Sequence, residues 1–208
     1  MKQMGLFGGS FNPIHEGHLY LARSVRRCMR LDGVLLMPTG EAPHKSSAEY
    51  ASAADRLAMC RIAAKRRPWM TVSDYEIAKG GKSYTVETLR HLRQTVPDTR
   101  WTLMIGSDML LSFDRWHCWQ EILSLAALCA VSRETGDLPA LAECAEGLRA
   151  ECPDAEITVL NLPAHPVSST QIRSNLQNNA DCSCLLPQNV VQYIRKHGLY
   201  LKSENRGE

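Results

Sequence analysis

The sequence lacks any apolar run that is long enough to cross a membrane. A spanning helix needs about 20 consecutive apolar residues, and no stretch of the 208-residue chain approaches that length. The N-terminal stretch reaches Asn12 and Pro13 too early to have the pattern of a secretion signal. We therefore expect a cytoplasmic protein that makes no membrane contact.

There is also little excess charge of either sign. The chain carries 24 basic and 22 acidic residues, a formal net charge of +2. A protein that coats nucleic acid needs a basic face, and the cluster Lys65-Arg66-Arg67 is better explained as a solvated helix end. We expect no nucleic-acid partner. Hydrophobic residues make up 44% of the chain, which is enough for one sizeable core.

Paired metal-binding cysteines are missing as well. The eight cysteines include no CxxC pair, and the spacing of Cys182 and Cys184 is uncommon for zinc ligands. We expect reduced thiols that pack as small apolar groups. No dedicated metal cage, internal repeat or low-complexity segment is visible.

Short apolar strands alternate with helical stretches along the whole chain. Strands are predicted at 2–7, 33–37, 70–73, 101–105, 127–131 and 157–160, and helices at 15–29, from 52, 85–95, 120–125, 138–150, 168–176 and 190–197. This alternation predicts an α/β fold, a doubly wound, Rossmann-like open parallel sheet with helices on both faces. We expect a single domain over 1–208, with a small C-terminal helical portion from about 168 and a frayed tail at 202–208.

The helix that Ser52 opens has a recognisable start. Asp55 follows three residues later, a spacing typical of a capped N-terminus. Its apolar face is predicted to comprise Leu57, Ala58, Ile62 and Ala63.

One group of chemistry-bearing residues, 8–18, lies between the first strand and the first helix. Gly8 and Gly9 would let the backbone approach a nucleotide, whose phosphates could meet N–H groups at the helix start. His15 and His18 are three residues apart and share one helix face, and Gly17 between them leaves room for a flat ring or a sugar. Two imidazoles there suit a transition state that gains negative charge on phosphate oxygens.

A second group starts a late helix. Ser168, Ser169 and Thr170 are good N-cap residues, and Arg173 lies one turn further on. Hydroxyls, backbone N–H groups and a guanidinium in this arrangement could hold phosphate oxygens. By itself the pattern is better explained as a plain helix cap with a solvated arginine, because Ser and Thr caps are common. A doubly wound fold can bring both groups to one cleft, because distant strands become neighbours where the strand order reverses.

Together the two groups resemble the paired signatures of the nucleotidylyltransferase superfamily, G-x-F-[DN]-P-x-H-x-G-H and I-S-S-T-x-I-R. Within it, the chain is similar along almost its whole length to the bacterial nicotinate mononucleotide adenylyltransferases. The similarity also involves 38–45, 83–85, 105–108 with Trp116, and 186–200.

This resemblance implies roles for individual residues. His15, His18 and Arg173 would be catalytic and would stabilise the phosphates. The ATP site would be formed by Gly8, Gly9, Ser10, Phe11, Gly17, Gly106, Asp108, Ser169 and Thr170. The acceptor would be bound by Lys45, Thr85, Trp116 and His117, with Trp116 stacking on the pyridine ring. Thr39, His117 and Val167 depart from the usual family residues, and the first two affect the acceptor pocket.

The implied reaction needs no nucleophilic side chain, because the acceptor phosphate itself attacks the α-phosphorus of ATP, with Mg²⁺ bridging the ATP phosphates.

Several alternatives stay open. The acceptor could be nicotinamide mononucleotide, or pantetheine or glycerol phosphate, although those last families are shorter and the pantetheine enzymes usually have Thr in place of His15. A non-catalytic nucleotide-binding module is a further alternative, disfavoured because the histidines and Arg173 are present. There are also structural alternatives for single residues. Trp116 would pack in the core, Asp108 and Thr85 would cap helices, and Lys45 would be a solvated charge.

Overall fold

The computed structural model describes residues 1–40, 50–132, 135–163 and 165–201. The predicted acceptor-binding Lys45 and the predicted frayed tail at 202–208 lie outside these residues. Within them, every helix is either too short or too polar to cross a bilayer.

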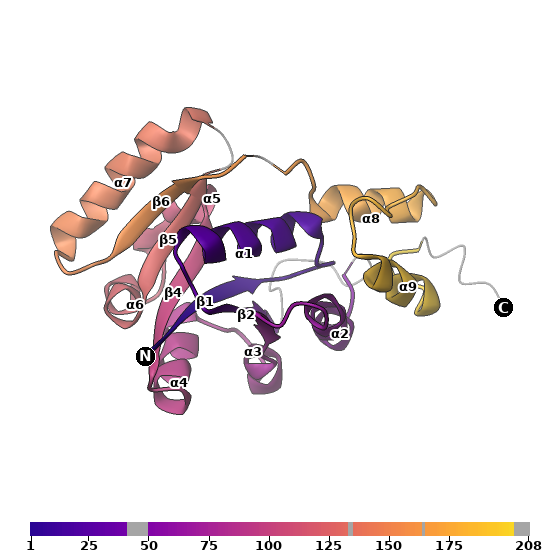
Figure 1. The fold of residues 1–208 in the computed structure, drawn as a ribbon, viewed down its shortest axis with the longest axis horizontal. Helices are drawn as coiled ribbons and strands as arrows, with labels where there is room; N and C mark the ends of the chain where they lie inside the picture. The colour runs from indigo at the N-terminus through magenta and orange to yellow at the C-terminus, as the bar shows by residue number, and fades with distance from the viewer. Residues whose placement is uncertain (41–49, 133–134, 164, 202–208) are drawn as a thin grey trace. The chain divides into compact units, whose positions relative to one another are not determined.

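In the described part of the chain, the strands form one six-stranded sheet (Figure 1). They are β1 (Lys2–Gly9), β2 (Gly33–Pro38), β3 (Met70–Val72), β4 (Thr99–Gly106), β5 (Ala127–Ser132) and β6 (Ile157–Asn161). Their order is β3-β2-β1-β4-β5-β6, so the chain moves outward in both directions from β1 and β4. Right-handed crossovers then place connecting helices on both faces of the sheet. The predicted doubly wound α/β fold is confirmed.

Helices connect these strands at the predicted places. They are α1 (Glu16–Cys28), α2 (Ala53–Ala64), α3 (Tyr75–Lys79), α4 (Thr85–Thr95), α5 (Ser107–Leu110), α6 (Trp119–Leu125), α7 (Leu138–Glu151), α8 (Ser169–Gln177) and α9 (Gln188–Lys196). Short 3₁₀ helices lie at Phe113–Arg115 and Thr135–Asp137. The short helices α3 and α5 were not predicted, because four or five residues are too few to show a helical period.

By their internal contacts, residues divide into two compact units that alternate along the chain. One comprises 1–8, 21–35 and 83–165, and the other comprises 9–20, 36–82 and 166–208. The prediction of a single domain stays a prediction. Except for Gly8, the second unit contains both groups of residues that the sequence singled out for phosphate chemistry.

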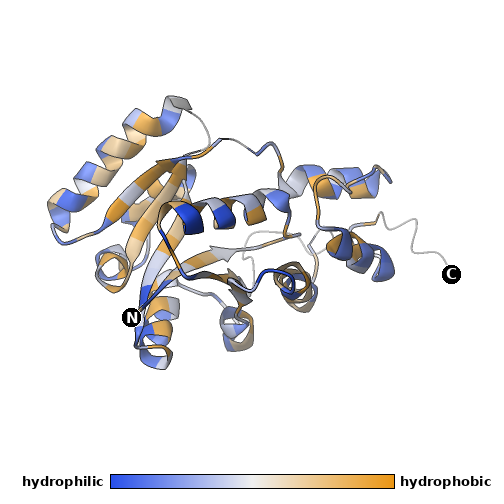
Figure 2. Ribbon diagram, in the orientation of Figure 1, coloured by the Kyte–Doolittle hydropathy of each residue, from blue (hydrophilic) through white to orange (hydrophobic). Residues whose placement is uncertain are grey.

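The first unit is built on the apolar strands β4, β5 and β6, which pair in parallel. A row of Leu6, Leu103, Leu128 and Ile157 runs across β1, β4, β5 and β6 in register, and each side chain is buried. Figure 2 shows the apolar colouring of these strands. β4 and β5 are buried along most of their length, which is typical of strands that are covered on both faces.

The predicted packing of cysteine is supported by their environments. All eight thiols are free, and Cys60, Cys129 and Cys182 are buried. Burial raises the pKa of the Cys60 and Cys129 thiols well above the usual range. These groups therefore stay protonated and pack as small apolar side chains.

Helix α2 begins as predicted but buries a different face. Ser52 caps it by accepting a hydrogen bond from the Asp55 backbone N–H at 3.0 Å. Its buried residues are Arg56, Leu57, Met59, Cys60, Ala63 and Ala64. The predicted face was wrong for Ala58 and Ile62, which are half-buried. An arginine occupies part of the inward face, a placement that an apolar pattern does not reveal.

Candidate functional site

The loop after β1 is buried although it carries polar residues. Phe11, Asn12 and Ile14 are at most 1% exposed, and His15 is 5% exposed. Phe11 adopts a positive φ of 45°, a conformation that is uncommon for residues other than glycine. The Asn12–Pro13 peptide bond is cis. This buried loop leads from β1 to His15, which directly precedes α1.

His15 and His18 hold each other in place. Their rings stack with centroids 3.7 Å apart at an interplanar angle of 26°. The backbone N–H of His15 donates to Nδ1 of His18 at 3.2 Å, and the backbone N–H of His18 donates to Nδ1 of His15 at 3.3 Å. Because Nδ1 is the acceptor in both rings, the neutral tautomer carries its hydrogen on Nε2. Both Nε2–H groups can therefore donate to an anionic oxygen.

Gly17 is needed for this arrangement. A Cβ atom at position 17 would lie 3.0 Å from Nδ1 of His15 and 3.5 Å from the Val167 carbonyl oxygen. The space that glycine provides is therefore used by the His15 ring and by the segment before α8. We predicted that this space would receive a ligand ring or sugar, and the structure gives a different local reason for glycine.

The start of α1 offers one backbone donor. The Glu16 N–H donates to the Leu185 carbonyl at 3.0 Å, and that of His18 donates to the His15 carbonyl at 2.9 Å. Within the residues that the structure covers, the N–H of Gly17 has no acceptor. This N–H group lies at the positive end of a 13-residue helix, where an anion is favoured.

The second group of predicted residues contacts the first directly. Ser168 caps α8 by accepting a hydrogen bond from the Gln171 N–H at 3.2 Å. The Ser169 hydroxyl donates to the Pro13 carbonyl at 3.2 Å. Arg173 donates through one nitrogen to the Asn12 carbonyl at 3.0 Å and through the other to Oγ1 of Thr170 at 3.3 Å.

Two helix starts more than 150 residues apart thus share one loop. Imidazole donors stand at the start of α1, and a guanidinium and hydroxyls stand at the start of α8. The combination can stabilise several phosphate oxygens at once. The phosphate-binding roles of these residues stay predictions, and this geometry supports them.

Other predicted ATP-site residues lie around the end of β1. Gly8 is exposed, and a Cβ there would meet nothing within 4 Å. The carbonyl of Gly9 accepts a hydrogen bond from the Thr39 N–H at 3.0 Å, which joins the ends of β1 and β2. Ser10 is half-buried, and its carbonyl accepts from Arg56 at 2.8 Å. Phe11 contacts His18 edge to face, with centroids 5.1 Å apart.

Gly106 and Asp108 lie in the first unit, at the carboxyl end of β4. A Cβ on Gly106 would lie 2.8 Å from Oδ1 of Asp108, so the carboxylate folds back over the strand end. Asp108 is exposed in the first turn of α5 and does not cap that helix through its side chain. The structural alternative of a helix cap is therefore wrong for Asp108, and its role in ATP binding stays a prediction.

The predicted acceptor-binding residues of the first unit contribute aromatic rings and a hydroxyl. His117 is exposed and contacts the Tyr84 ring with centroids 4.7 Å apart. Thr85 is the half-buried first residue of α4. Trp116 is also half-buried and packs on Phe113 at 5.1 Å, so it is not an enclosed core residue.

Two important residues were missed by the sequence reasoning. Arg56 is 1% exposed and donates to carbonyl groups of the loop after β1 and of the segment after β2. The Tyr200 hydroxyl donates to Oδ1 of Asn12 at 2.7 Å, and burial raises the pKa of Tyr200 above its usual range. A charged residue on the inward side of α2 was the available signal for Arg56. No local pattern marks Tyr200.

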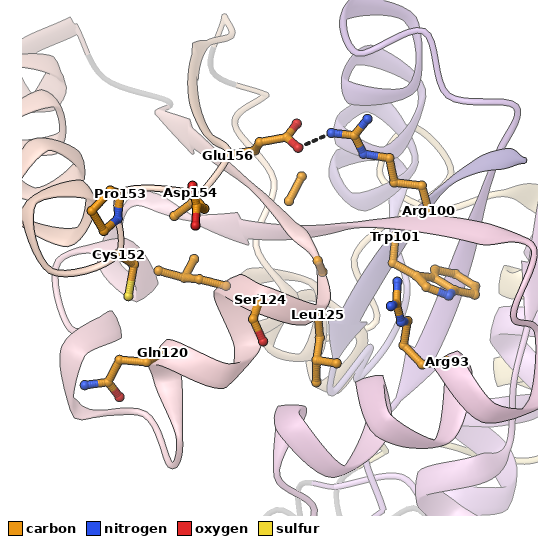
Figure 3. A pocket seen from close by; sticks show the side chains of 14 residues that line it. Arg93, Arg100, Trp101, Gln120, Ser124, Leu125, Cys152, Pro153, Asp154 and Glu156 are labelled. Atoms are coloured by element: carbon orange, nitrogen blue, oxygen red, sulfur yellow. Dashed lines mark hydrogen bonds and ion pairs between the residues drawn. The ribbon is translucent and has the colours of Figure 1, made fainter.

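A separate pocket in the first unit does not contain these residues. It has a volume of about 410 Å³ and is lined by Arg93, Arg100 and Trp101, among others (Figure 3). These side chains lie near the beginning of β4, and Ala126 and Ala127 place the pocket near the beginning of β5 as well. Ligands of open parallel sheets bind at the carboxyl ends of strands, so this pocket is not the candidate site.

No group of three His, Cys, Asp or Glu side chains in the described ranges is placed to hold a metal ion. A divalent cation in a phosphate site of this kind can instead be held by the nucleotide phosphates and water.

The chain is similar to known proteins over most of its length. Residues 6–175 match the model of the cytidylyltransferase-like family. A protein of Synechococcus sp. (strain JA-3-3Ab), named as a probable nicotinate-nucleotide adenylyltransferase, is 39% identical over 96% of this chain and 95% of its own length. A protein of the same name from Neisseria meningitidis serogroup B is 39% identical over 97% of this chain and 100% of its own length.

The fold also resembles a solved structure. Plasmodium falciparum nicotinic acid mononucleotide adenylyltransferase, complexed with NaAD, superposes with a TM-score of 0.76 at 17% identity. The match covers 96% of this chain and 98% of the other. At this identity the likeness concerns the fold.

Proposed function

Because the chain belongs to the nicotinate-nucleotide adenylyltransferases of the cytidylyltransferase-like family, we propose that it transfers the adenylyl group of ATP to nicotinate mononucleotide. The products are nicotinate adenine dinucleotide and pyrophosphate, in the biosynthesis of NAD. We further infer that it works in the cytoplasm.

The observation that carries this proposal is the shared loop of the two helix starts. His15 and His18 present Nε2 donors, while Arg173 is held on the Asn12 carbonyl of the same loop. A triphosphate carries its charge over a row of oxygens, and donors from two directions can contact different parts of that row.

The chemistry follows from the charge that the reaction moves. A phosphate oxygen of the acceptor attacks the α-phosphorus in line. The new P–O bond forms as the bond from the α-phosphorus to the bridging β-phosphate oxygen breaks, and pyrophosphate leaves with that electron pair. The residues of the site need only position the reactants and stabilise the negative charge on the equatorial and leaving oxygens.

ATP would enter as its Mg²⁺ complex, with the cation bound to the substrate phosphates and to water. In this proposal His15 and His18 donate to ATP phosphates in the transition state. Ser169, Thr170 and Arg173 hold the β- and γ-phosphates. The orientation of both rings by backbone N–H groups means that no reorganisation is needed when charge develops.

Acceptor choice would belong to Thr85, Trp116 and His117, with Lys45 near the acceptor phosphate. The exposed His117 ring and the half-buried Trp116 ring offer aromatic surface to a pyridine. A carboxylate on that pyridine is the expected substituent, and the amide is the closest competitor.

An assay of pyrophosphate release tests the proposal. The purified protein is given MgATP with nicotinate mononucleotide, nicotinamide mononucleotide or pantetheine phosphate in separate reactions. We expect the highest kcat/KM with nicotinate mononucleotide. Faster turnover of the amide would correct the acceptor, and turnover of none of the three would overturn the proposal.

A further inference from the structure

Arg56 is a buried cation whose partners are backbone carbonyls. It lies on α2 with 1% of its surface exposed. Its two terminal nitrogens donate to the carbonyls of Ser10 at 2.8 Å, Thr39 at 2.8 Å and Gly40 at 2.6 Å. Nε donates to the Ala51 carbonyl at 3.3 Å. One side chain therefore joins three segments that are separate in the sequence.

Two of these segments leave the carboxyl ends of neighbouring strands. Ser10 follows β1 and precedes the histidine motif, and Thr39 and Gly40 follow β2. The carboxyl ends of parallel strands are where open α/β sheets bind their ligands. Arg56, which lies on α2 and belongs to neither segment, holds the two segments at a fixed separation.

Charge pairing does not explain why this position holds a cation. No Asp or Glu lies within ion-pair distance of Arg56 among the residues that the structure describes. Burial lowers the pKa of its guanidinium, but arginine titrates so far above neutrality that the group stays charged. The Tyr50 ring lies 5.4 Å from the guanidinium carbon and adds a favourable cation–π contact. The remaining stabilisation comes from the four carbonyls.

We propose that Arg56 is a positioning residue for adenylyl transfer, which holds the loop that presents His15 and His18 at a fixed separation from the segment after β2. The inference rests on the proposed function. Arg56 acts through the Ser10, Thr39 and Gly40 carbonyls and does not contact the substrates.

This position requires the planar guanidinium group of arginine, with its several N–H donors. Four carbonyls at different directions need several N–H groups in a fixed plane, which a guanidinium provides. A lysine ammonium keeps the charge but cannot reach three separate segments from one nitrogen. Arg56→Lys therefore separates the effect of geometry from the effect of charge, and Arg56→Met removes both while keeping the bulk.

Met59→Ala is the matched control for stability. Met59 is fully buried on the same helix, and among the described residues no hydrogen bond joins its side chain to either loop. Truncating it should lower the melting temperature without moving the loops. Each variant is assayed well below its melting temperature, with circular dichroism to confirm folding.

We expect Arg56→Met and Arg56→Lys to lower kcat with MgATP and nicotinate mononucleotide by about 10-fold or more, the scale expected when a reacting group is displaced by a fraction of an ångström. Met59→Ala should keep kcat within about twofold. If the Arg56 variants lose only stability and keep kcat, as the control does, Arg56 is structural and the inference fails.

Hydrogen–deuterium exchange makes the result independent of catalysis. The Arg56 variants should raise exchange in peptides that cover 9–18 and the residues just after β2, and Met59→Ala should not. Equal exchange in all variants would overturn the inference even if the wild type proved inactive. The wild type could instead be inactive while its loops are protected from exchange and only the Arg56 variants lose that protection. This result would overturn the proposed function alone. Should Arg56→Met fail to fold, Arg56→Lys carries the same comparison.

Discussion

The loop after β1 and the segment after β4 differ in their burial and in the contacts that hold them. In the first, Asn12 and His15 are buried, and side chains from α2 and α8 bind backbone carbonyls. In the second, Asp108, Met109 and Leu111 are exposed, and its hydrogen bonds are mostly local, such as those from the Ser112 hydroxyl to nearby carbonyls, beside ring contacts. The first region is buried and held by guanidinium groups from other helices, whereas the second exposes more side chains and is held mainly by local hydrogen bonds and ring packing.

This difference corresponds to two separate tasks in the proposed reaction, charge stabilisation and acceptor recognition. Stabilising charge on phosphate oxygens needs donors at fixed positions, since a small displacement weakens them strongly. Recognising a flat acceptor ring needs apolar surface and tolerates some movement. Substitutions in the fixed region should therefore reduce kcat, and those in the open region should raise the KM of one substrate.

The largest effect is expected from His18→Ala. It removes an Nε2 donor and also the acceptor for the His15 backbone N–H. We expect kcat to fall by at least about 100-fold, the scale for losing one transition-state donor. Steady-state kinetics measure it, with His91→Ala on α4 as the matched histidine control. Near-full activity in His18→Ala would show that the imidazole at position 18 does not stabilise the transition state.

Arg173→Lys should have the next largest effect. The substitution keeps the charge but loses the fork that contacts both the Asn12 carbonyl and Thr170. We expect about a 10-fold loss in kcat/KM for ATP, because a bidentate contact becomes a single one. Arg27→Lys, on the exposed end of α1, is the control. An unchanged value would show that Arg173 does not hold ATP.

Trp116→Ala tests the open region. We expect about a five- to tenfold higher KM for nicotinate mononucleotide, with the KM for ATP unchanged, from the loss of a stacking surface. Substrate-saturation curves for both substrates separate the two values. A lower melting temperature with both KM values unchanged would mean that Trp116 serves only to pack on Phe113.

The smallest effect is expected from Tyr200→Phe. Its hydroxyl keeps its proton, because burial raises the pKa of Tyr200, and it donates to Oδ1 of Asn12. That oxygen would still accept the Ala51 N–H at 3.1 Å. The free energy of unfolding should fall by about 1 kcal/mol, as for one hydrogen bond, with kcat nearly unchanged. Urea unfolding measures it, and a large loss of kcat would place Tyr200 in the fixed region.

The sequence predicted most of the fold because its signals are local. The strand at 101–105 is apolar except for Thr102, and Ser52 and Ser168 both cap helices as expected. The general rule for doubly wound sheets predicted that the two helix starts would come together, and His18 and Arg173 each hydrogen-bond to the backbone of the loop after β1 or of His15, which follows it.

The remaining features depend on tertiary contacts that no local pattern specifies. Gly17 appeared to leave room for a ligand, but its neighbour is the His15 ring. Arg56 interrupts an apolar face, and its partners are carbonyls, which every residue possesses. Tyr200 reaches Asn12 across 188 residues. A charged residue beside an apolar face could have marked Arg56 as unusual, but its carbonyl partners, and the partners of Gly17 and Tyr200, are set by tertiary contacts that no local pattern specifies.

A crystal structure with a non-hydrolysable ATP analogue and Mg²⁺ is the most direct test of the central claim. We expect one triphosphate to receive hydrogen bonds both from Nε2 of His18 and from the guanidinium of Arg173. A triphosphate bound elsewhere, or one that contacts only one of these two side chains, would contradict it.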